Sequence, residues 1–323
     1  MVNEQIVNEI RTLTREKNAI IMAHFYQRPE VQEVADFIGD SLALAQQAAK
    51  TDAKIIVLCG VHFMAETAKI LCPDKLVLIP EPKAGCSLAD SCQAEDLRAW
   101  KAAHPDHYIV SYVNTSAAVK ALTDVVVTSS NALKIVRAIP ADKPVLFGPD
   151  HNLGAYISQQ TGRELTLWDG ACHVHSRFSA EALMALKREH PDAPVLAHPE
   201  CKQILLNLSD VIGSTQALLS YVKNHPDTHE FIIATESGVI HEMRKAVPDA
   251  TFIPVPPEIS EGDTRDSFLP KGVGCMCNEC EYMRMVTLEK LRDCLLHEAP
   301  AVDVDPEIAQ QAIIPIQRML ELS

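Results

Sequence analysis

Short runs of apolar, often β-branched residues recur along the chain, and polar loops or helical patterns separate them. Continuous apolar runs of this length are typical of parallel strands that helices bury on both faces. The pattern therefore predicts an α/β fold. The clearest runs are IIMAH at 20–24, IIVLC at 55–59, IVSYV at 109–113, VLFG at 145–148, VLAH at 195–198 and FIIA at 231–234.

One pattern of strands and helices occurs three times without gaps. Asp36, Asp124 and Asp210 are separated by 88 and 86 residues. The same two intervals relate His24, Tyr112 and His198, and also Ser41, Ser129 and Thr215. We therefore expect three homologous α/β/α units with parallel sheets in a pseudo-threefold triangular arrangement. A single doubly wound sheet is the alternative, because its βαβ units also repeat weakly.

The repeat also sets the expected domain boundaries. The first unit covers 18–85, with an N-terminal helix at 1–17 and C-terminal helices at 281–323 packing on it. The second unit covers 104–171, and the third covers 190–256. A long cysteine-bearing loop at 257–280 follows the third unit.

Polar side chains stand at equivalent strand ends in all three repeats. In parallel α/β units, ligands bind beyond the carboxyl ends of the strands. His24, Tyr112 and His198 occupy these positions after the first strand of each repeat. Ser41, Ser129 and Thr215 follow the second strand and open a helix, where they suit N-caps or contacts to an anionic ligand.

A loop with cysteine follows the last strand of each repeat. These loops carry Cys86 and Cys92, then Cys172, and then Cys275, Cys277 and Cys280. Three converging thiolates can bind zinc, or three corners of an iron–sulfur cube whose remaining iron can act as a Lewis acid. By contrast, Cys59, Cys72 and Cys294 are typical of packing residues.

Zinc would need one more ligand than the three loops supply. Cys92, His173 and His175 are the candidates for that fourth position. The two histidines could equally be surface loop residues. From the spacing alone, both metal types stay open.

Composition excludes several classes of function. The chain has 323 residues, with 29 Lys and Arg against 43 Asp and Glu, and a formal charge of −14. Such a balance argues against nucleic acid or an anionic membrane as a partner. The sequence contains no apolar stretch of about 18 residues that could span a membrane. We expect a cytoplasmic protein whose ten cysteines do not form a disulfide scaffold.

A series of motifs follows in order along nearly the whole chain: AHFYQ, GCSLADSC, SYVNTSAAVKA, VVTSSNA, GPDHNLG, GACHVH, AHPEC and CEYMRMVTLEKL. Together they resemble the quinolinate synthase (type A) family. The resemblance implies the condensation of iminoaspartate with dihydroxyacetone phosphate to quinolinate, in NAD biosynthesis, with loss of phosphate and water. It also implies one oxygen-sensitive 4Fe–4S cluster per chain, with three cysteine ligands and an open iron that acts as a Lewis acid.

The resemblance also implies roles for individual residues. Cys86, Cys172 and Cys280 match the cluster ligands. This chain has C-x-C-x-x-C where C-x-x-C-x-x-C is common, so Cys277 and Cys275 are the second and third choices for the last ligand. The implied catalytic residues are Tyr26, Glu200, His24, His198 and Tyr112. The implied substrate-binding residues are His24, Ser41, Tyr112, Asn114, Ser129, His198, Glu200 and Thr215.

Proton transfer on the triose falls to Glu200 and Tyr26 in this interpretation. A Glu buried near apolar strand ends is expected to have a raised pKa. An L-aspartate oxidase or dehydrogenase would be a transient partner that supplies iminoaspartate. The alternatives are an aconitase-like hydro-lyase with an open-iron cube, and a non-catalytic sensor that uses the C-x-C-x-x-C loop as a thiol or metal switch.

Overall fold

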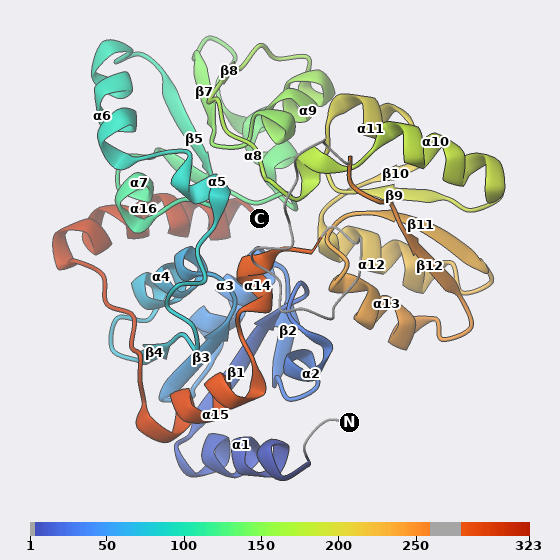
Figure 1. Cartoon of the computed structure of the whole chain (residues 1–323). Helices are drawn as coiled ribbons and strands as arrows, with labels where there is room; N and C mark the ends of the chain where they lie inside the picture. The colour runs from blue at the N-terminus through green and yellow to red at the C-terminus, as the bar shows by residue number, and fades with distance from the viewer. Residues whose placement is uncertain (1–3, 259–278) are drawn as a thin grey trace.

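Three α/β units form a triangle in the computed structural model, which describes residues 4–258 and 279–323 (Figure 1). Each unit contains a four-stranded parallel sheet in which the first strand lies between the second and the third. The strand orders are β2-β1-β3-β4, β6-β5-β7-β8 and β10-β9-β11-β12. The expectation of three homologous α/β/α units is confirmed, and the alternative of one long sheet is wrong.

The first unit has an outer layer that comes from both ends of the described chain. Helices α1 (Glu4–Glu16) and α15 (Leu288–His297) pack together on one face of its sheet. The other face packs on α3 and α4. The remaining elements are β1 (Ala19–His24), α2 (Pro29–Gln32), β2 (Phe37–Gly39), α3 (Ser41–Lys50), β3 (Ile55–Cys59), α4 (His62–Leu71), β4 (Leu76–Leu78) and α5 (Ser87–Asp90).

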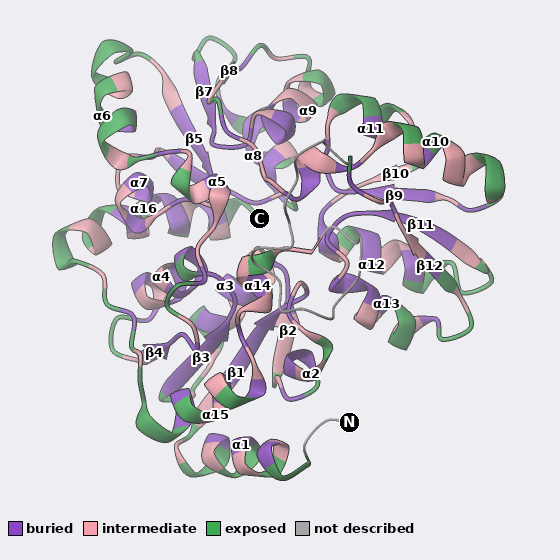
Figure 2. Cartoon of the chain, viewed as in Figure 1, coloured by how far each residue is buried: buried purple, intermediate pink, exposed green. Residues whose placement is uncertain are grey.

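The second and third units repeat this layering, with buried strands inside and half-exposed helices outside (Figure 2). The second contains α6 (Ala94–Ala103), β5 (Tyr108–Tyr112), α7 (Ala117–Lys120), β6 (Val125–Val127), α8 (Ala132–Ala138), β7 (Val145–Gly148), α9 (His151–Thr161), β8 (Thr166–Leu167) and a 3-10 turn η1 (His175–Arg177). The third contains α10 (Ala180–Glu189), β9 (Val195–Ala197), α11 (Gln203–Asn207), β10 (Val211–Ile212), α12 (Thr215–Asn224), β11 (Glu230–Ala234), α13 (Val239–Ala246) and β12 (Thr251–Pro254), and α14 (Glu281–Arg284) follows.

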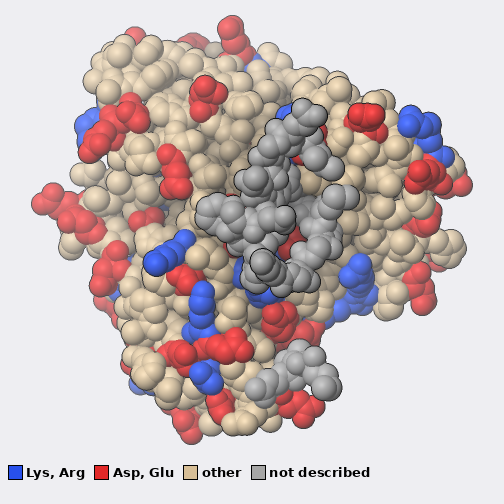
Figure 3. Space-filling view, viewed as in Figure 1, with Lys and Arg blue, Asp and Glu red and all other residues tan. Residues whose placement is uncertain are grey.

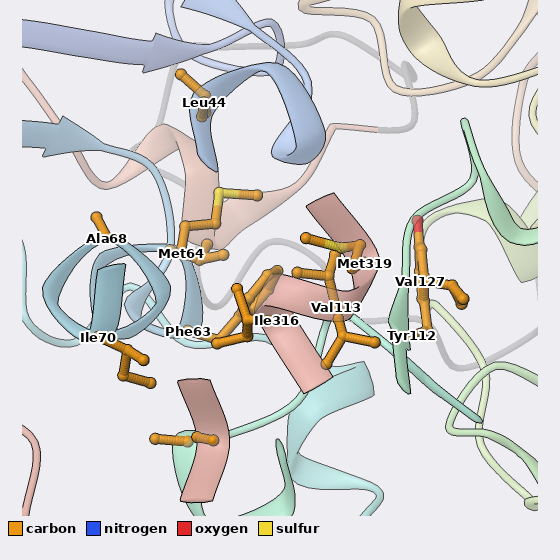
Figure 4. Close-up of a cluster of buried hydrophobic side chains, with 14 of the residues drawn as sticks. Leu44, Phe63, Met64, Ala68, Ile70, Tyr112, Val113, Val127, Ile316 and Met319 are labelled. Carbon is orange, nitrogen blue, oxygen red and sulfur yellow. The ribbon is translucent and has the colours of Figure 1, made fainter. Parts of the chain in front are cut away.

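The last helix, α16 (Pro306–Leu322), joins two units. It packs on α7 and β6 of the second unit and on α4 of the first. In Figure 4 its Ile316 lies between Phe63 of the first unit and Val113 of the second, and its Met319 lies near Val113. Helix α16 thus packs on the first unit, as expected for 281–323, but also on the second unit, which the sequence analysis did not predict.

The three aspartates that define the repeat have a structural role. The carboxylate of each aspartate accepts a hydrogen bond from the backbone N–H of a residue in the first strand of its unit. The backbone N–H of the aspartate in turn donates to the carbonyl of that same strand residue. The pairs are Asp36 with Ile21, Asp124 with Ile109 and Asp210 with Val195, at 2.7–2.8 Å from carboxylate oxygen to nitrogen. These bonds tie the residue that precedes the second strand of each unit to the first strand.

Replacing Asp124 with Ala should lower the free energy of unfolding by about 1–3 kcal/mol, because the Ile109 N–H loses its acceptor. Denaturant titration measures the change. Asp124→Asn is the matched control, since its amide oxygen can still accept, and it should cost less. Equal losses in the two variants would contradict this role.

Charges are spread over the surface. On the face drawn in Figure 3, Asp and Glu side chains lie on all three units, and Lys and Arg side chains lie among them. Among the helices built by the described residues, none is both long and apolar enough to cross a membrane.

Candidate functional site

One cavity lies where the carboxyl ends of the three sheets meet. It encloses about 700 Å³, including the part that opens to solvent. Every site residue predicted from the sequence lines it, so the structure brings together side chains from all three units. These residues are His24, Tyr26, Ser41, Cys86, Tyr112, Asn114, Ser129, Cys172, His198, Glu200, Thr215 and Cys280.

Three cysteines reach the cavity from three loops. Cys86 and Cys280 are the N-cap residues of α5 and α14, and Cys172 precedes η1. Burial raises the pKa of all three thiols, that of Cys86 to about 11. The nearby Cys86 raises the pKa of the other two further. Cys275 and Cys277, the other choices for a third ligand, lie outside the described residues.

The candidates for a fourth zinc ligand differ in position. Cys92 is buried against Leu97 and Ile109 and does not line the cavity. His173 lines the cavity, but its two ring nitrogens contact Ser87 and Glu281. For His175 the alternative of a surface loop residue is wrong, because its side chain is only 2% exposed and its Nδ1 lies 3.3 Å from the Cys172 Sγ.

Glu200 is the centre of the polar network. Its Oε1 accepts a hydrogen bond of 2.6 Å from the hydroxyl of Tyr112, and its Oε2 lies 2.9 Å from His175 Nδ1. His198 Nδ1 lies 3.8 Å from Oε1. The carboxyl is 4% exposed. A buried carboxylate is therefore surrounded by groups that can donate to it.

The pKa of Glu200 is lower than we expected. Burial by itself raises the pKa, but the imidazoles of His198 and His175 and the hydrogen bonds from His175 and Tyr112 outweigh it and hold the pKa below its usual range. The prediction of a raised pKa is wrong, because it considered the apolar strands and not these donors. Glu200 is thus ionised at neutral pH.

Two histidines at the strand ends are neutral at physiological pH. Burial lowers the pKa of His24 and of His198 to about 3, although Glu200 opposes the shift. The Nε2 of His198 lies 3.2 Å from the hydroxyl of Ser129. Neutral imidazoles can form hydrogen bonds with a ligand without adding charge to the cavity.

None of the three repeated hydroxyl residues is an N-cap. The N-cap residues are Asp40 of α3, Asn131 of α8 and Ser214 of α12. Ser41 and Thr215 are the first helical residues of α3 and α12, and like Ser129 they line the cavity. The N-cap alternative is therefore wrong, and the position of Ser41 and Thr215 beside a helix N-terminus favours anionic groups.

A hydrogen-bonded chain joins the cysteine loop to the first unit. The Nε2 of His175 lies 3.0 Å from the hydroxyl of Thr235, which lies 3.0 Å from the hydroxyl of Tyr26. The Tyr26 hydroxyl also lies 2.7 Å from that of Thr215. Burial and the nearby Glu200 raise the pKa of Tyr26 well above its usual value, so the phenol is neutral.

Two buried carboxylates that the sequence analysis missed accept hydrogen bonds from the backbone N–H groups of two cysteines. Asp150 Oδ2 accepts from the N–H of Cys172 at 3.1 Å, and Glu236 Oε1 accepts from that of Cys280 at 3.2 Å. A sequence signal for them exists, because Asp150 and Glu236 are separated by 86 residues, the second interval of the repeat.

Lys120 is a further residue that the sequence did not reveal. It is fully buried, and its Nζ donates to the carbonyls of Val113, at 2.8 Å, and Thr115, on either side of Asn114. Burial lowers the pKa of this lysine to about 8. It belongs to the motif SYVNTSAAVKA, but the sequence analysis assigned it no role.

The described residues include a set of donors that fits a metal. One ligand atom each from Cys172, His175 and Glu200 lies within 4.8 Å of the others. Cys86 and Cys280 line the same cavity and add soft thiol donors. Such a donor set suits zinc or an iron–sulfur centre.

Comparison with known proteins gives one consistent result. The model of a family described as "Quinolinate synthetase A protein" matches residues 8–321. Proteins named quinolinate synthase from Microcystis aeruginosa and Nostoc punctiforme are 52% and 53% identical over 99% and 97% of this chain, and over 96% and 92% of their own lengths. One from Prochlorococcus marinus is 52% identical over 97% of this chain and 90% of its own.

Proposed function

Because the chain belongs to the quinolinate synthetase A protein family, we propose that it is a quinolinate synthase. The reaction would be the condensation of iminoaspartate with dihydroxyacetone phosphate, with loss of phosphate and water, catalysed by an enzyme of the transferase or lyase type. The observation that carries this proposal is a cavity that three cysteines, the ionised and buried Glu200 and the repeated hydroxyl residues line. These hydroxyl residues are Ser41, Ser129 and Thr215.

Cys86, Cys172 and Cys280 would hold a 4Fe–4S cluster. The thiols fit this group, because each is half-buried in the cavity lining and has a raised pKa, so a thiolate there needs the positive charge of a metal nearby. When bound by three cysteines, the cluster supplies a Lewis-acidic iron with a vacant coordination position. The described cysteines are all free thiols, which suits a reducing cytoplasm.

The substrate carboxylates would bind at the hydroxyl residues. Ser41 and Thr215 open α3 and α12 and line the cavity, so their hydroxyls lie beside helix N-termini, which favour anions. Each helix end contributes about 0.3–1 kcal/mol to the binding of an anion. Among the described lining residues there is no Lys or Arg, so this arrangement explains how a chain of charge −14 can bind anionic substrates there.

Glu200 would accept a proton from a carbon of the triose. An ionised carboxylate can act as a general base, and the Tyr112 hydroxyl fixes its orientation. The neutral Tyr26 phenol, held by Thr215 and Thr235, would donate a proton or a hydrogen bond to an oxygen of the substrate. His24 and His198 would hold substrate oxygens as neutral hydrogen-bonding groups.

Iminoaspartate is an imine that water hydrolyses, so a nearby enzyme would supply it. An L-aspartate oxidase or dehydrogenase makes this compound, and we propose a transient contact with such an enzyme.

Anaerobic turnover tests the proposal. Purified protein is incubated with dihydroxyacetone phosphate and iminoaspartate generated by an L-aspartate oxidase, and quinolinate and phosphate are followed by chromatography. We expect both products to appear together, and iron and sulfide at about four each per chain. Iron-loaded protein that forms no quinolinate would refute the activity, and about one zinc per chain would refute the cluster.

A further inference from the structure

The residue that follows each of the three cavity cysteines takes part in one hydrogen-bonded chain. Ser87 follows Cys86, His173 follows Cys172, and Glu281 follows Cys280. The Ser87 Oγ lies 2.6 Å from His173 Nδ1, and His173 Nε2 lies 2.9 Å from Glu281 Oε2. One imidazole therefore links the loops that carry all three cysteines.

The direction of the two bonds follows from the groups involved. An ionised carboxylate can only accept, so the Nε2–H of His173 donates to Glu281. The hydroxyl of Ser87 can donate to Nδ1 in turn. Histidine suits the central place, because its two nitrogens lie on different edges of a rigid ring and can reach two neighbours at once.

The chain lies on the outer rim of the cavity. Ser87 and His173 line the cavity, while the side chains of His173 and Glu281 are 28% and 55% exposed. The ring of Tyr282 contacts the imidazole edge-on, with 6.0 Å between the ring centres. Ser87 and Glu281 are the first residues of α5 and α14, directly after the N-cap cysteines, and Figure 1 shows α14 at the centre of the triangle.

We propose that Ser87, His173 and Glu281 form a latch, which ties the three cysteine loops together at the rim and slows the loss of the cluster. This inference rests on the cluster of the proposed function. The three are positioning residues, because they act through the backbone of the adjacent cysteines. For the cluster to leave, the loops have to separate, and separation breaks both bonds of the latch.

The latch is distinct from the inner contacts of α14. There the Glu236 carboxylate accepts from the N–H of Cys280 and pairs with Arg284 at 3.1 Å. These inner contacts tie α14 to the third unit. The latch instead ties it to the loops that follow the first and second units, so removing the latch leaves the inner contacts in place.

Chelator challenge of the anaerobic holoenzyme tests the latch. The visible absorption of the cluster is followed after addition of EDTA to wild type, His173→Phe, Glu281→Ala and Glu281→Gln. We expect His173→Phe to lose its cluster about tenfold faster, because two partly exposed hydrogen bonds are lost, and tenfold corresponds to about 1.4 kcal/mol. Glu281→Gln retains an acceptor oxygen and should restore most of the retention that Glu281→Ala loses.

A remote histidine–glutamate pair provides the matched control. His241 and Glu33 lie 2.7 Å apart and are 24% and 50% exposed, much like the latch pair. His241→Phe should lose its cluster at the wild-type rate, and thermal unfolding of apo His173→Phe should match that of apo wild type. Wild-type retention in His173→Phe, or equal acceleration in His241→Phe, would overturn the latch. Absence of iron and sulfide in freshly purified wild type would instead refute the proposed cluster.

Discussion

Replacing Cys86, Cys172 or Cys280 with Ala is expected to leave the purified protein without the proposed cluster and without activity. Each loop supplies one thiol to the shared cavity, and the remaining two cannot hold three corners of a cube. Anaerobic purification followed by iron and sulfide analysis measures the loss. We expect each single variant to lose nearly all of its iron and sulfide, because each lacks one of the three cysteine ligands.

Cys92→Ala is the matched control for these variants. Cys92 is as close in sequence to Cys86 as any other cysteine, but it packs against Leu97 and Ile109 and does not line the cavity. The variant should keep its iron and lose only packing energy. Cys277→Ala should keep iron as well, and loss of iron there with retention in Cys280→Ala would make Cys277 the third ligand.

The repeat was strong enough to predict the fold. The intervals of 88 and 86 residues placed strands, aspartates and strand-end side chains in register, and the structure gives the three sheets the same strand order. The intervals between equivalent residues are kept because each aspartate accepts the same hydrogen bond from a backbone N–H of the first strand of its unit. The position of α16 did not follow from the pattern, since an amphipathic helix can cover any of several apolar surfaces.

The site could be predicted as a set of residues, but not as a network. Equivalent strand ends converge by symmetry, which brought His24, Tyr112 and His198 to one cavity. The bond from Tyr112 to Glu200 joins positions that are not equivalent in the repeat, so it depends on how two units are oriented. The lowered pKa of Glu200 depends on the same orientation, and the sequence alone does not contain it.

A wider use of the repeat would have found more of the site. Tyr26, Asn114 and Glu200 follow the same intervals of 88 and 86, as do His62, Asp150 and Glu236. The second set includes the two carboxylates that accept from the N–H groups of Cys172 and Cys280. Lys120 also lies 88 residues after a buried polar residue, Gln32. The Gln32 Nε2 donates to the carbonyls of Phe25 and Gln27, and the Lys120 Nζ donates to those of Val113 and Thr115, at the same interval of 88.

Glu200→Gln is expected to reduce kcat by about 10²–10⁴-fold while leaving the cluster spectrum and the fold unchanged. Glutamine has the size of glutamate, and its amide oxygen can still accept from the Tyr112 hydroxyl. What it loses is the basic carboxylate that would take a proton from the triose. Anaerobic kinetics with matched iron content measure the effect, and activity within about threefold of wild type would rule out Glu200 as the base.

Tyr112→Phe removes the hydrogen bond that the Tyr112 hydroxyl donates to Glu200 but leaves the carboxylate itself in place. Burial raises the pKa of Glu200, and the bonds from Tyr112 and His175 together with the imidazoles lower it. Without the Tyr112 hydroxyl the pKa of Glu200 should rise, because the charged form loses a donor. The acidic limb of kcat/KM should therefore move to higher pH in Tyr112→Phe, with activity regained as the pH rises, whereas Glu200→Gln should lack that limb altogether. An acidic limb that persists in Glu200→Gln would show that another group titrates, so the base would have to be sought among the other cavity residues.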